Sequence, residues 1–251
     1  MVSRHFPGAL PGPFRRPGGA RRRAQVIGFL DEIVVGDCLP DFAGVKIGRR
    51  DKAFSAPAFE KREVFRSDYG IVAAALLELL PFETVLDVGC ANGFLLESFL
   101  KAGRSARGIE LSPAVIKILS PELLEVIDVG DFAAATGSWE LVCCVEVAEH
   151  IPPERSRELV RKLTGLATSW IYFTAAPVGQ TGRGHINCRS HLEWLDWFAL
   201  EGWVLSPLSH DLRQRLERLE RARWLVGNGA LLAPLPGSKS QRVPQAGPSK
   251  E

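Results

Sequence analysis

The chain has 251 residues and a formal net charge of +2; hydrophobic residues make up 46% and charged residues 24% of it. This composition is ordinary for a globular protein that buries a full core. No apolar run approaches the roughly 20 residues that a membrane-spanning helix requires, so no membrane role is expected. The near-neutral charge gives no overall electrostatic sign of a nucleic-acid partner.

The two ends differ in composition from the rest. Residues 1–25 carry six arginines, no acid and many prolines and glycines. We interpret them as a disordered basic leader; an RNA-binding arm or an organelle-targeting presequence is the alternative. Residues 234–251 are rich in Pro, Ser, Gln, Lys and Gly and predict a disordered tail. One folded domain is expected over 26–233, with a lid and helices over 26–80 and a core over 81–233.

The five cysteines are Cys38, Cys90, Cys143, Cys144 and Cys188, and their spacing matches no metal site or disulfide framework. Without a secretory signal, the chain suits a reducing cytoplasm. The acids and histidines likewise show no ligand spacing, so no metal is expected.

The first predicted elements precede a glycine-rich turn. Residues 24–41 fit either a short helix or a strand, and residues 45–58 predict a loop that covers a ligand or serves as a plain linker. A helix is predicted over 69–80, with Ser67-Asp68 as its N-cap and Pro81 ending it.

The turn itself is bounded by a strand and a helix. Residues 84–88 are β-branched and apolar, Gly89 and Gly93 follow, and residues 94–100 have apolar residues at helical spacing. Glycines in such a turn let the backbone come close to a ligand, and the following helix offers N–H groups. A polar or anionic ligand is therefore expected.

Two acids end adjacent predicted strands. Asp87 lies just before Gly89, where burial of a carboxylate requires partners, and we expect it to meet a donor. About twenty residues later, residues 107–112 predict a second strand that ends in Glu110, the position of a ribose-hydroxyl acceptor in dinucleotide-type folds. Together the two carboxylates suggest a nucleoside ligand.

The rest of the chain continues the alternation of strands and helices. We predict a short helix opened by Pro113, strands at 125–127, 141–145, 170–174 and 203–205, and helices at 155–167, 190–201 and 209–223. Strands that alternate with helices predict an α/β fold with a parallel sheet and right-handed crossovers. The tryptophans of 190–201 are interpreted as core.

Four motifs carry a family resemblance. Val-Leu-Asp-Val-Gly-Cys-Ala-Asn-Gly-Phe at 85–94 and Gly-Ile-Glu-Leu-Ser at 108–112 resemble the first two motifs of class I S-adenosylmethionine-dependent methyltransferases. Val-Gly-Asp-Phe at 129–132 and Leu-Val-Cys-Cys-Val-Glu-Val-Ala-Glu-His-Ile-Pro at 141–152 resemble the third and fourth, in the right order. One departure is Ala91, which stands where the first motif usually has its middle glycine.

The resemblance implies a fold and a cofactor. The fold is a Rossmann-like doubly wound sheet of seven strands, mostly parallel with an antiparallel last strand over 224–232, and with helices on both faces. The cofactor is S-adenosyl-L-methionine. By resemblance, the loop holds its methionine end, Glu110 accepts from its ribose, Asp131 accepts from its adenine and Phe132 packs on that ring; a purely capping role is the alternative for Asp131. The implied cofactor-binding set is Asp87, Gly89, Cys90, Ala91, Gly93, Glu110, Leu111, Asp131, Phe132 and Glu146.

Two histidines are candidates for the catalytic step. An oxygen or nitrogen acceptor must lose a proton, and histidine is the natural general base near neutral pH. His185 lies in Gly-Arg-Gly-His-Ile-Asn at 182–187, which resembles a stretch of bacterial methyltransferases that act on small molecules and sugars. We predict His185 as the base or orienter of the acceptor, and His150 as the alternative. A structural role for His150, with Glu146 or Glu149 as its partner, remains open.

Three other functions share some of these features. A nicotinamide-dependent oxidoreductase shares the glycine turn but not the segment at 146–151. A nucleic-acid methyltransferase usually has Pro-Pro and an aromatic residue after the fourth strand, where this chain has Val-Glu-Val at 145–147. A domain that binds the cofactor without turnover is the third. We predict methyl transfer to an oxygen, or a nitrogen, of a small-molecule or sugar-like acceptor; the oligomeric state is left open.

Overall fold

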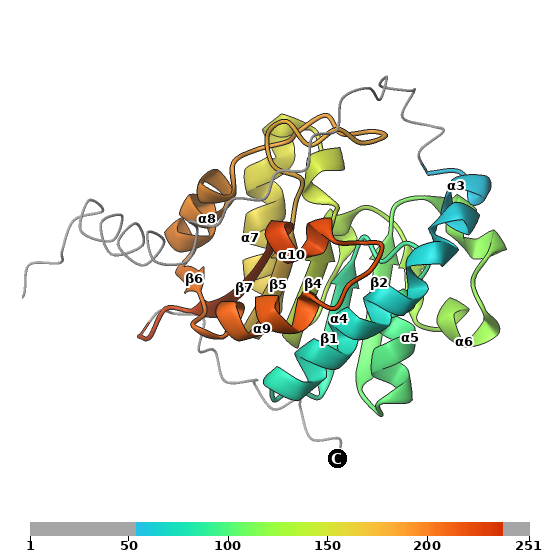
Figure 1. Cartoon of the computed structure of the whole chain (residues 1–251), viewed down its shortest axis with the longest axis horizontal. Coiled ribbons are helices and arrows are strands. Elements are labelled where there is room, and N and C mark those ends of the chain that lie inside the picture. Colours follow the sequence, from blue (N-terminus) through green and yellow to red (C-terminus); the bar gives the residue numbers. More distant parts are fainter. Residues whose placement is uncertain (1–53, 238–251) are drawn as a thin grey trace, which may run out of the picture. The chain divides into compact units, whose positions relative to one another are not determined.

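The computed structural model describes residues 54–237 (Figure 1). Predictions for residues 1–53 and 238–251, which include the leader, the 24–41 element, most of the 45–58 loop and most of the tail, lie outside this range. A seven-stranded sheet has the order β3-β2-β1-β4-β5-β7-β6. Its strands are β1 Thr84–Val88, β2 Ser105–Glu110, β3 Ile127–Val129, β4 Trp139–Val145, β5 Ala167–Thr174, β6 Trp203–Leu205 and β7 Gly229–Pro234.

Helices connect these strands. The α-helices are α3 Ala56–Glu60, α4 Arg66–Leu79, α5 Phe94–Lys101, α6 Pro121–Leu124, α7 Ser156–Leu166, α8 His191–Leu200, α9 Leu208–Leu216 and α10 Trp224–Asn228. Short 3-10 turns are η1 Lys61–Phe65, η2 Pro113–Lys117, η3 Phe132–Ala134, η4 Ala148–His150 and η5 Pro153–Arg155. The elements around the glycine turn and from β4 to β6 agree with the sequence-based predictions to within a few residues.

The sheet is mostly parallel. β1 pairs in parallel with β2 and β4, and β7 pairs antiparallel with both β5 and β6. This confirms the predicted doubly wound α/β fold with an antiparallel last strand. Since β2 lies on one side of β1 and β4 on the other, the connection reverses direction between β1 and β4. Ligands of such sheets bind at the carboxyl ends of the strands beside that reversal.

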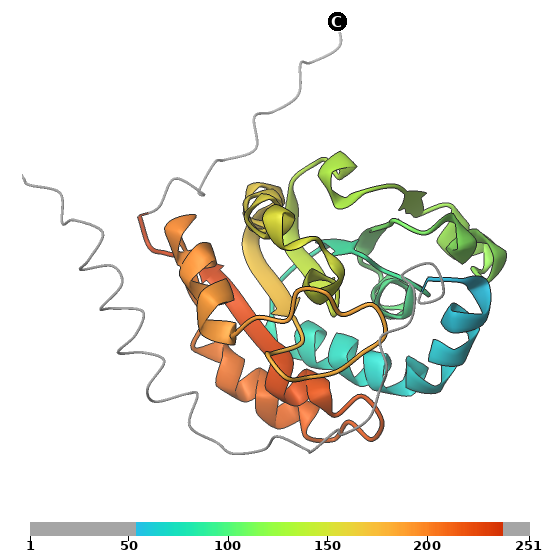
Figure 2. The ribbon, with the colours of Figure 1, turned by 90° about the horizontal axis from the view of Figure 1, so that it is seen from above.

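Helices cover both faces of the sheet, as the two views show (Figures 1 and 2). Adjacent residues of β5 illustrate the division, because successive strand side chains point to opposite faces. Tyr172 belongs to the core formed with α4, α5 and α9. Phe173 packs instead against Trp194 and Phe198 of α8, with ring centroids 5.3 and 5.1 Å away. The buried Trp194 confirms the core role predicted for it.

The predicted N-cap of the first long helix is wrong. Helix α4 begins at Arg66, so Asp68 lies inside its first turn. The Asp68 carboxylate is almost fully buried and accepts hydrogen bonds from the backbone N–H groups of Glu220, Arg221 and Ala222. It therefore caps a loop more than 150 residues away, a partnership that no local pattern shows.

The C-terminal part also differs from the prediction. Residues 224–228 form α10, and the antiparallel strand begins only at Gly229. It extends to Pro234, and the Leu235 N–H donates to the Gly202 carbonyl at 2.7 Å, so the first residues of the predicted tail are part of the fold. Within the predicted 45–58 loop, α3 begins at Ala56. The third strand starts at Ile127, two residues after its predicted start.

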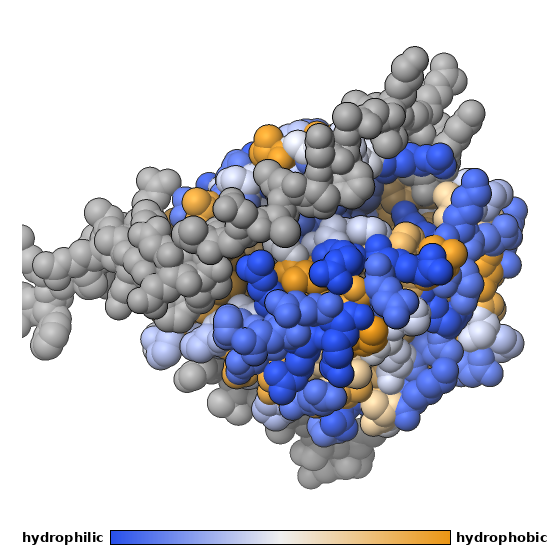
Figure 3. Space-filling view, viewed as in Figure 1, coloured by the Kyte–Doolittle hydropathy of each residue, from blue (hydrophilic) through white to orange (hydrophobic). Residues whose placement is uncertain are grey.

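Helix α9 has one buried side and one polar side. Leu212 and Leu216 are buried, whereas His210 and Gln214 are exposed. Figure 3 shows a largely hydrophilic surface over this part of the molecule, with scattered hydrophobic residues. This agrees with the amphipathic spacing of the sequence. Among residues 54–237, no helix has the length and apolar character needed to span a bilayer.

Candidate active site

A cavity of about 830 Å³ lies at the carboxyl ends of the central strands. Every predicted site residue except Gly93 lines it. Its volume is near the upper end of the roughly 300–1,000 Å³ of small-molecule sites, which leaves room for a cofactor and an acceptor together. The structure thus brings together residues from β1, β2, β4 and the loop after β5.

The glycine-rich turn is held by close contacts. Gly89 has φ +77, and a Cβ there would lie 2.4 Å from Cγ2 of Val147. Gly93 has φ +71 and turns the chain into α5, which explains why it is needed although it does not line the cavity. Ala91 takes φ 45, in the left-handed region that costs a residue with a Cβ about 1–2 kcal/mol. The alanine therefore retains the conformation of the usual glycine.

The N–H groups of this turn are bound within the protein. Those of Gly89 and Cys90 donate to the Ile109 carbonyl, and that of Ala91 donates to Oε2 of Glu110 at 3.0 Å. Glu110 also accepts the Ser112 N–H on Oε1 at 2.9 Å. The Glu110 carboxylate thus shapes the loop and also lines the cavity. Because the N–H groups of Gly89, Cys90 and Ala91 already have partners within the protein, the turn serves a ligand by letting the backbone come close to it.

Asp87 lies at the end of β1 and is 4% exposed. Within residues 54–237 no hydrogen-bond donor reaches its carboxylate, contrary to the expectation that it meets one. Burial, and secondarily the charge of Glu110, raise the pKa of Asp87 to about 7. A cationic ligand group beside Asp87 would favour its ionised form.

Asp131 caps the turn η3 through the Ala133 N–H at 2.9 Å and also binds Arg155. The Arg155 guanidinium donates to both carboxylate oxygens, at 2.7 and 2.8 Å. These contacts hold the pKa of Asp131 below its ordinary value, chiefly through Arg155. The same guanidinium lies 4.4 Å from the centre of the Phe132 ring. Asp131 therefore has the capping role that the sequence left open. Arg155, which the sequence did not single out, also lines the cavity.

Arg62 is a cavity residue that the sequence did not single out. Its side chain reaches the cavity from η1 and lies 5.0 Å from the centre of the Phe59 ring. Burial lowers its pKa from the ordinary value, against the opposing effect of Tyr69, Glu110 and Glu149. No ion pair or hydrogen bond to its guanidinium is found within residues 54–237. In the sequence Arg62 stands between two other charged residues, in Lys-Arg-Glu at 61–63, and this local pattern does not indicate that its side chain lines a cavity.

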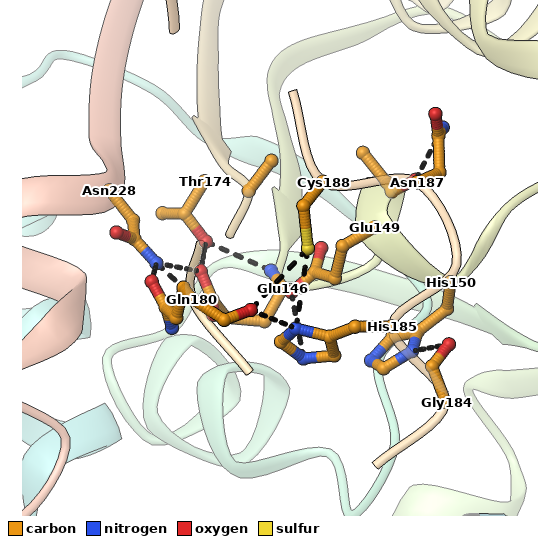
Figure 4. Close-up of polar contacts among 12 residues, drawn as sticks. Glu146, Glu149, His150, Thr174, Gln180, Gly184, His185, Asn187, Cys188 and Asn228 are labelled. Carbon is orange, nitrogen blue, oxygen red and sulfur yellow. Dashed lines mark hydrogen bonds and ion pairs between the residues drawn. The ribbon is translucent and has the colours of Figure 1, made fainter. Parts of the chain in front are cut away.

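Glu146 follows β4 in a strained conformation, with φ 55. Its carboxylate accepts from Thr174 Oγ1 at 2.8 Å and from the side-chain amide of Asn228 at 3.1 Å, and that amide also reaches Gln180 (Figure 4). Asn228, from α10, was not predicted as a site residue because it lies more than 80 residues from Glu146. These hydrogen bonds hold Glu146 in place at the start of the segment 146–150, which also carries Glu149 and His150.

Glu149 is fully buried, at 0% exposure. Neither carboxylate oxygen has a hydrogen-bond partner among residues 54–237. Burial, and then the charge of Glu146, raise the pKa of Glu149 well above its ordinary value. A buried carboxylate without partners is costly, so this group needs an explanation.

The two histidines lie side by side, with ring centroids 5.0 Å apart (Figure 4). Nδ1 of His150 is 3.0 Å from the Gly184 carbonyl, and Nδ1 of His185 is 3.1 Å from the Gln180 carbonyl. Nε2 of His185 lies 4.0 Å from Oε1 of Glu149. Burial lowers the pKa of His185, which favours the neutral ring. His150 is thus hydrogen-bonded to the 180–189 loop through its Nδ1.

This cavity, sheet order and motif set define a class I methyltransferase, and sequence comparison agrees. Residues 62–219 match the family described as "Methyltransferase domain". The chain belongs to this family, whose methyl donor is S-adenosylmethionine. The resemblance stated from the motifs is thereby confirmed.

Curated relatives match in the same region. A ubiquinone biosynthesis O-methyltransferase of Nitrosomonas europaea is 32% identical over 103 residues, which cover 37% of this chain and 43% of that protein. Another, from Xanthomonas campestris pv. campestris, is 38% identical over 96 residues, covering 35% and 38%. The match therefore spans less than half the length of these relatives.

Solved structures share the fold. Magnesium protoporphyrin IX methyltransferase from Synechocystis, with bound SAH, superposes with a TM-score of 0.52 at 18% identity and covers 85% of this chain and 96% of that one. A SAM-dependent methyltransferase from Archaeoglobus fulgidus gives a TM-score of 0.50 at 18% identity, covering 70% and 98%. At this identity the likeness extends to the fold alone.

The residues present fit S-adenosylmethionine. The close approach at Gly89 leaves no space for a side chain. The acids Asp87 and Glu110 and the cation Arg62 all line the cavity. These groups match an ammonium, a pair of hydroxyls and a carboxylate, the polar groups of this cofactor other than its base.

Proposed function

We propose that the chain transfers the methyl group of S-adenosylmethionine to an oxygen of a small-molecule acceptor. One observation carries this proposal: the cofactor-type acids and the pair of histidines line the same cavity of about 830 Å³. S-adenosylmethionine supplies a methyl group already activated by its sulfonium. The protein then has to align the acceptor with that group and to provide for the proton that the acceptor loses.

The cofactor's polar groups are assigned by charge. Arg62 binds its carboxylate and Asp87 lies toward its ammonium. Glu110 accepts from the ribose hydroxyls, since each of its oxygens accepts one backbone N–H and retains capacity for another. Asp131 and Phe132 form the adenine side together with Arg155. Cys90 and Leu111 contribute packing along the cavity wall.

The acceptor side is assigned to the loop after β5. His185 lies there with its Nδ1 held by the Gln180 carbonyl, so its Nε2 carries the lone pair that can orient or deprotonate a hydroxyl. His150, 5.0 Å away between ring centroids, is the alternative. Curated relatives named as O-methyltransferases support oxygen over nitrogen as the target. A sugar-like acceptor stays a prediction without independent support.

Calorimetric titration with S-adenosylmethionine, run beside NAD, tests the cofactor assignment. We expect saturable binding of S-adenosylmethionine only. The Glu110→Ala change should weaken it by about 1–3 kcal/mol, because a charged acceptor is lost. Release of S-adenosylhomocysteine is then followed against phenols, catechols, sugars, amines and a short RNA. Turnover with a hydroxyl compound supports the proposal. Turnover with amines alone, or with RNA alone, would contradict an oxygen of a small molecule as the methyl acceptor. A protein that does not bind S-adenosylmethionine would contradict the proposed function.

A further inference from the structure

We propose that Glu149, His150 and His185 form a binding site for one divalent cation at the acceptor end of the cavity. One ligand atom from each of these residues lies within 4.8 Å of the others (Figure 4). All three residues line the cavity. That the ion faces the methyl acceptor rests on the proposed function, whereas ion binding itself does not.

The Glu149 carboxylate is the first argument. It is 0% exposed, and neither oxygen has a hydrogen-bond partner among residues 54–237. A buried carboxylate is stable when it is hydrogen-bonded, paired or bound to a metal. Its nearest basic atom is Nε2 of His185 at 4.0 Å, too far for a hydrogen bond. Among residues 54–237, the Glu149 carboxyl group therefore has neither a hydrogen-bond donor nor a cation within contact distance.

The orientation of the imidazoles is the second argument. Each Nδ1 lies against a backbone carbonyl, that of Gly184 for His150 and that of Gln180 for His185. A carbonyl accepts only, so Nδ1 must carry the proton and the lone pair lies on Nε2 in both rings. Histidines that bind metals in proteins are commonly fixed in this way through their other nitrogen.

The backbone joins the two halves of the site. The Glu149 carbonyl accepts the N–H groups of Ile186 and Asn187, at 2.9 and 3.0 Å. The Asn187 side chain donates in addition to the Ala148 carbonyl at 3.1 Å and to Ser156 Oγ at 2.8 Å. The loop that carries His185 is thus attached directly to the segment that carries Glu149, so the three ligands are held close before any ion binds.

The donor set indicates the kind of ion. Two imidazoles and one carboxylate suit first-row divalent cations such as Zn²⁺ or Mn²⁺. Catalytic zinc sites use three protein ligands of this type and leave a position for water or substrate. Ligand distances of about 2.0–2.2 Å set tetrahedral ligands about 3.4 Å apart, so small rotations of the side chains would close the present spacing. An acceptor oxygen would occupy the open position. With the ion bound, His185 would hold the ion and so position the acceptor, and the ion would ease loss of the hydroxyl proton in place of the His185 lone pair.

Metal titration of the full chain, dialysed against EDTA and then freed of it, tests the site without using activity. Zn²⁺ binding is measured by calorimetry and Mn²⁺ binding by the electron paramagnetic resonance signal of the free ion. We expect one ion per chain. Glu149→Gln and His185→Asn should each weaken binding at least tenfold. The control His210→Asn changes an exposed histidine of α9 and should stay within twofold.

Cofactor binding by each variant shows that it is folded. Gly182→Ala is a second probe if Glu149→Gln or His185→Asn does not fold, because it displaces the His185 ring and keeps all three metal-binding side chains. It should also weaken binding of the ion. Equal affinities in wild type and the ligand variants, or no saturable binding by wild type, would overturn the site. A chain that binds S-adenosylmethionine but no ion overturns this site alone, whereas a chain that binds the ion but no cofactor overturns the proposed function.

Discussion

Gly182 leaves space for the imidazole of His185: a Cβ at position 182 would lie 2.1 Å from Nε2 and 2.3 Å from Cε1. Real Cβ atoms do not approach other heavy atoms so closely, so any side chain at 182 moves the ring. The His185 ring is thereby placed by its own loop, together with the hydrogen bond of Nδ1 to the Gln180 carbonyl at 3.1 Å.

Gly182→Ala should lower kcat at least tenfold and leave the dissociation constant of S-adenosylmethionine within a factor of two, because it moves a side chain on the acceptor side only. His185→Ala should do the same. Steady-state kinetics and calorimetry measure the two quantities. Gly165→Ala is the matched control: a Cβ there has nothing within 4 Å, and turnover should not change. Wild-type kcat in Gly182→Ala would remove the His185 ring from the reaction.

Arg62→Ala should weaken S-adenosylmethionine by about 1.5–3 kcal/mol, since a hydrogen-bonded charge pair with the cofactor carboxylate is lost. Methylthioadenosine lacks the amino-acid part, so its affinity should not change in this variant. Arg161→Ala, an exposed arginine of α7, is the control for loss of charge. Equal weakening of both ligands by Arg62→Ala would contradict the carboxylate assignment.

Asp87 should make the cofactor-free protein less stable as the pH rises. Its folded-state pKa of about 7 lies above the unfolded value, so between about pH 4 and 7 the folded form holds a proton that the unfolded form has released. The stabilisation is complete below about pH 4 and is lost by about pH 7, at up to about 1.4 kcal/mol per pH unit. Asp87→Asn removes this dependence.

Urea denaturation of both proteins at pH 5, 6, 7 and 8 measures the effect. The free energy of unfolding of Asp87→Asn, relative to wild type, should rise from pH 5 to 7 and level off above that. Other titrating groups are common to both proteins and cancel in the difference. A difference that stays constant over this range would show that Asp87 is ionised in the folded state throughout.

Asp68→Ala should lower the free energy of unfolding by about 2–4 kcal/mol. It removes the acceptor of three backbone N–H groups at 220–222, and the Arg221 N–H, now 2.7 Å from Oδ2, would lose its partner near the core. Glu220→Ala keeps the backbone of this loop and should change stability by less than about 0.5 kcal/mol. A similar small change in both variants would show that the cap is dispensable.

The strands, the glycine turn and the acids at the strand ends were predictable because their signals are local. The apolar run of β1, the turn through Gly89 and the acid that ends β2 lie within about 25 residues, and their residue types prescribe strand, turn and helix. The Trp224–Asn228 helix was misassigned as a strand because a short apolar run fits both structures. In that case the packing of α10 against α9 decided.

By itself, the sequence determined the order of strands and helices, the glycine turn and the identity of the acids at the strand ends, since each depends on neighbours along the chain. Only the tertiary structure decided which distant groups meet. It attached Asp68 to the 220–222 loop, placed Arg62 in the cavity, joined Asn228 to Glu146, and set His185 beside Glu149 and His150. The physical reason is that burial and charge pairing depend on distances in space, which no spacing along the chain encodes.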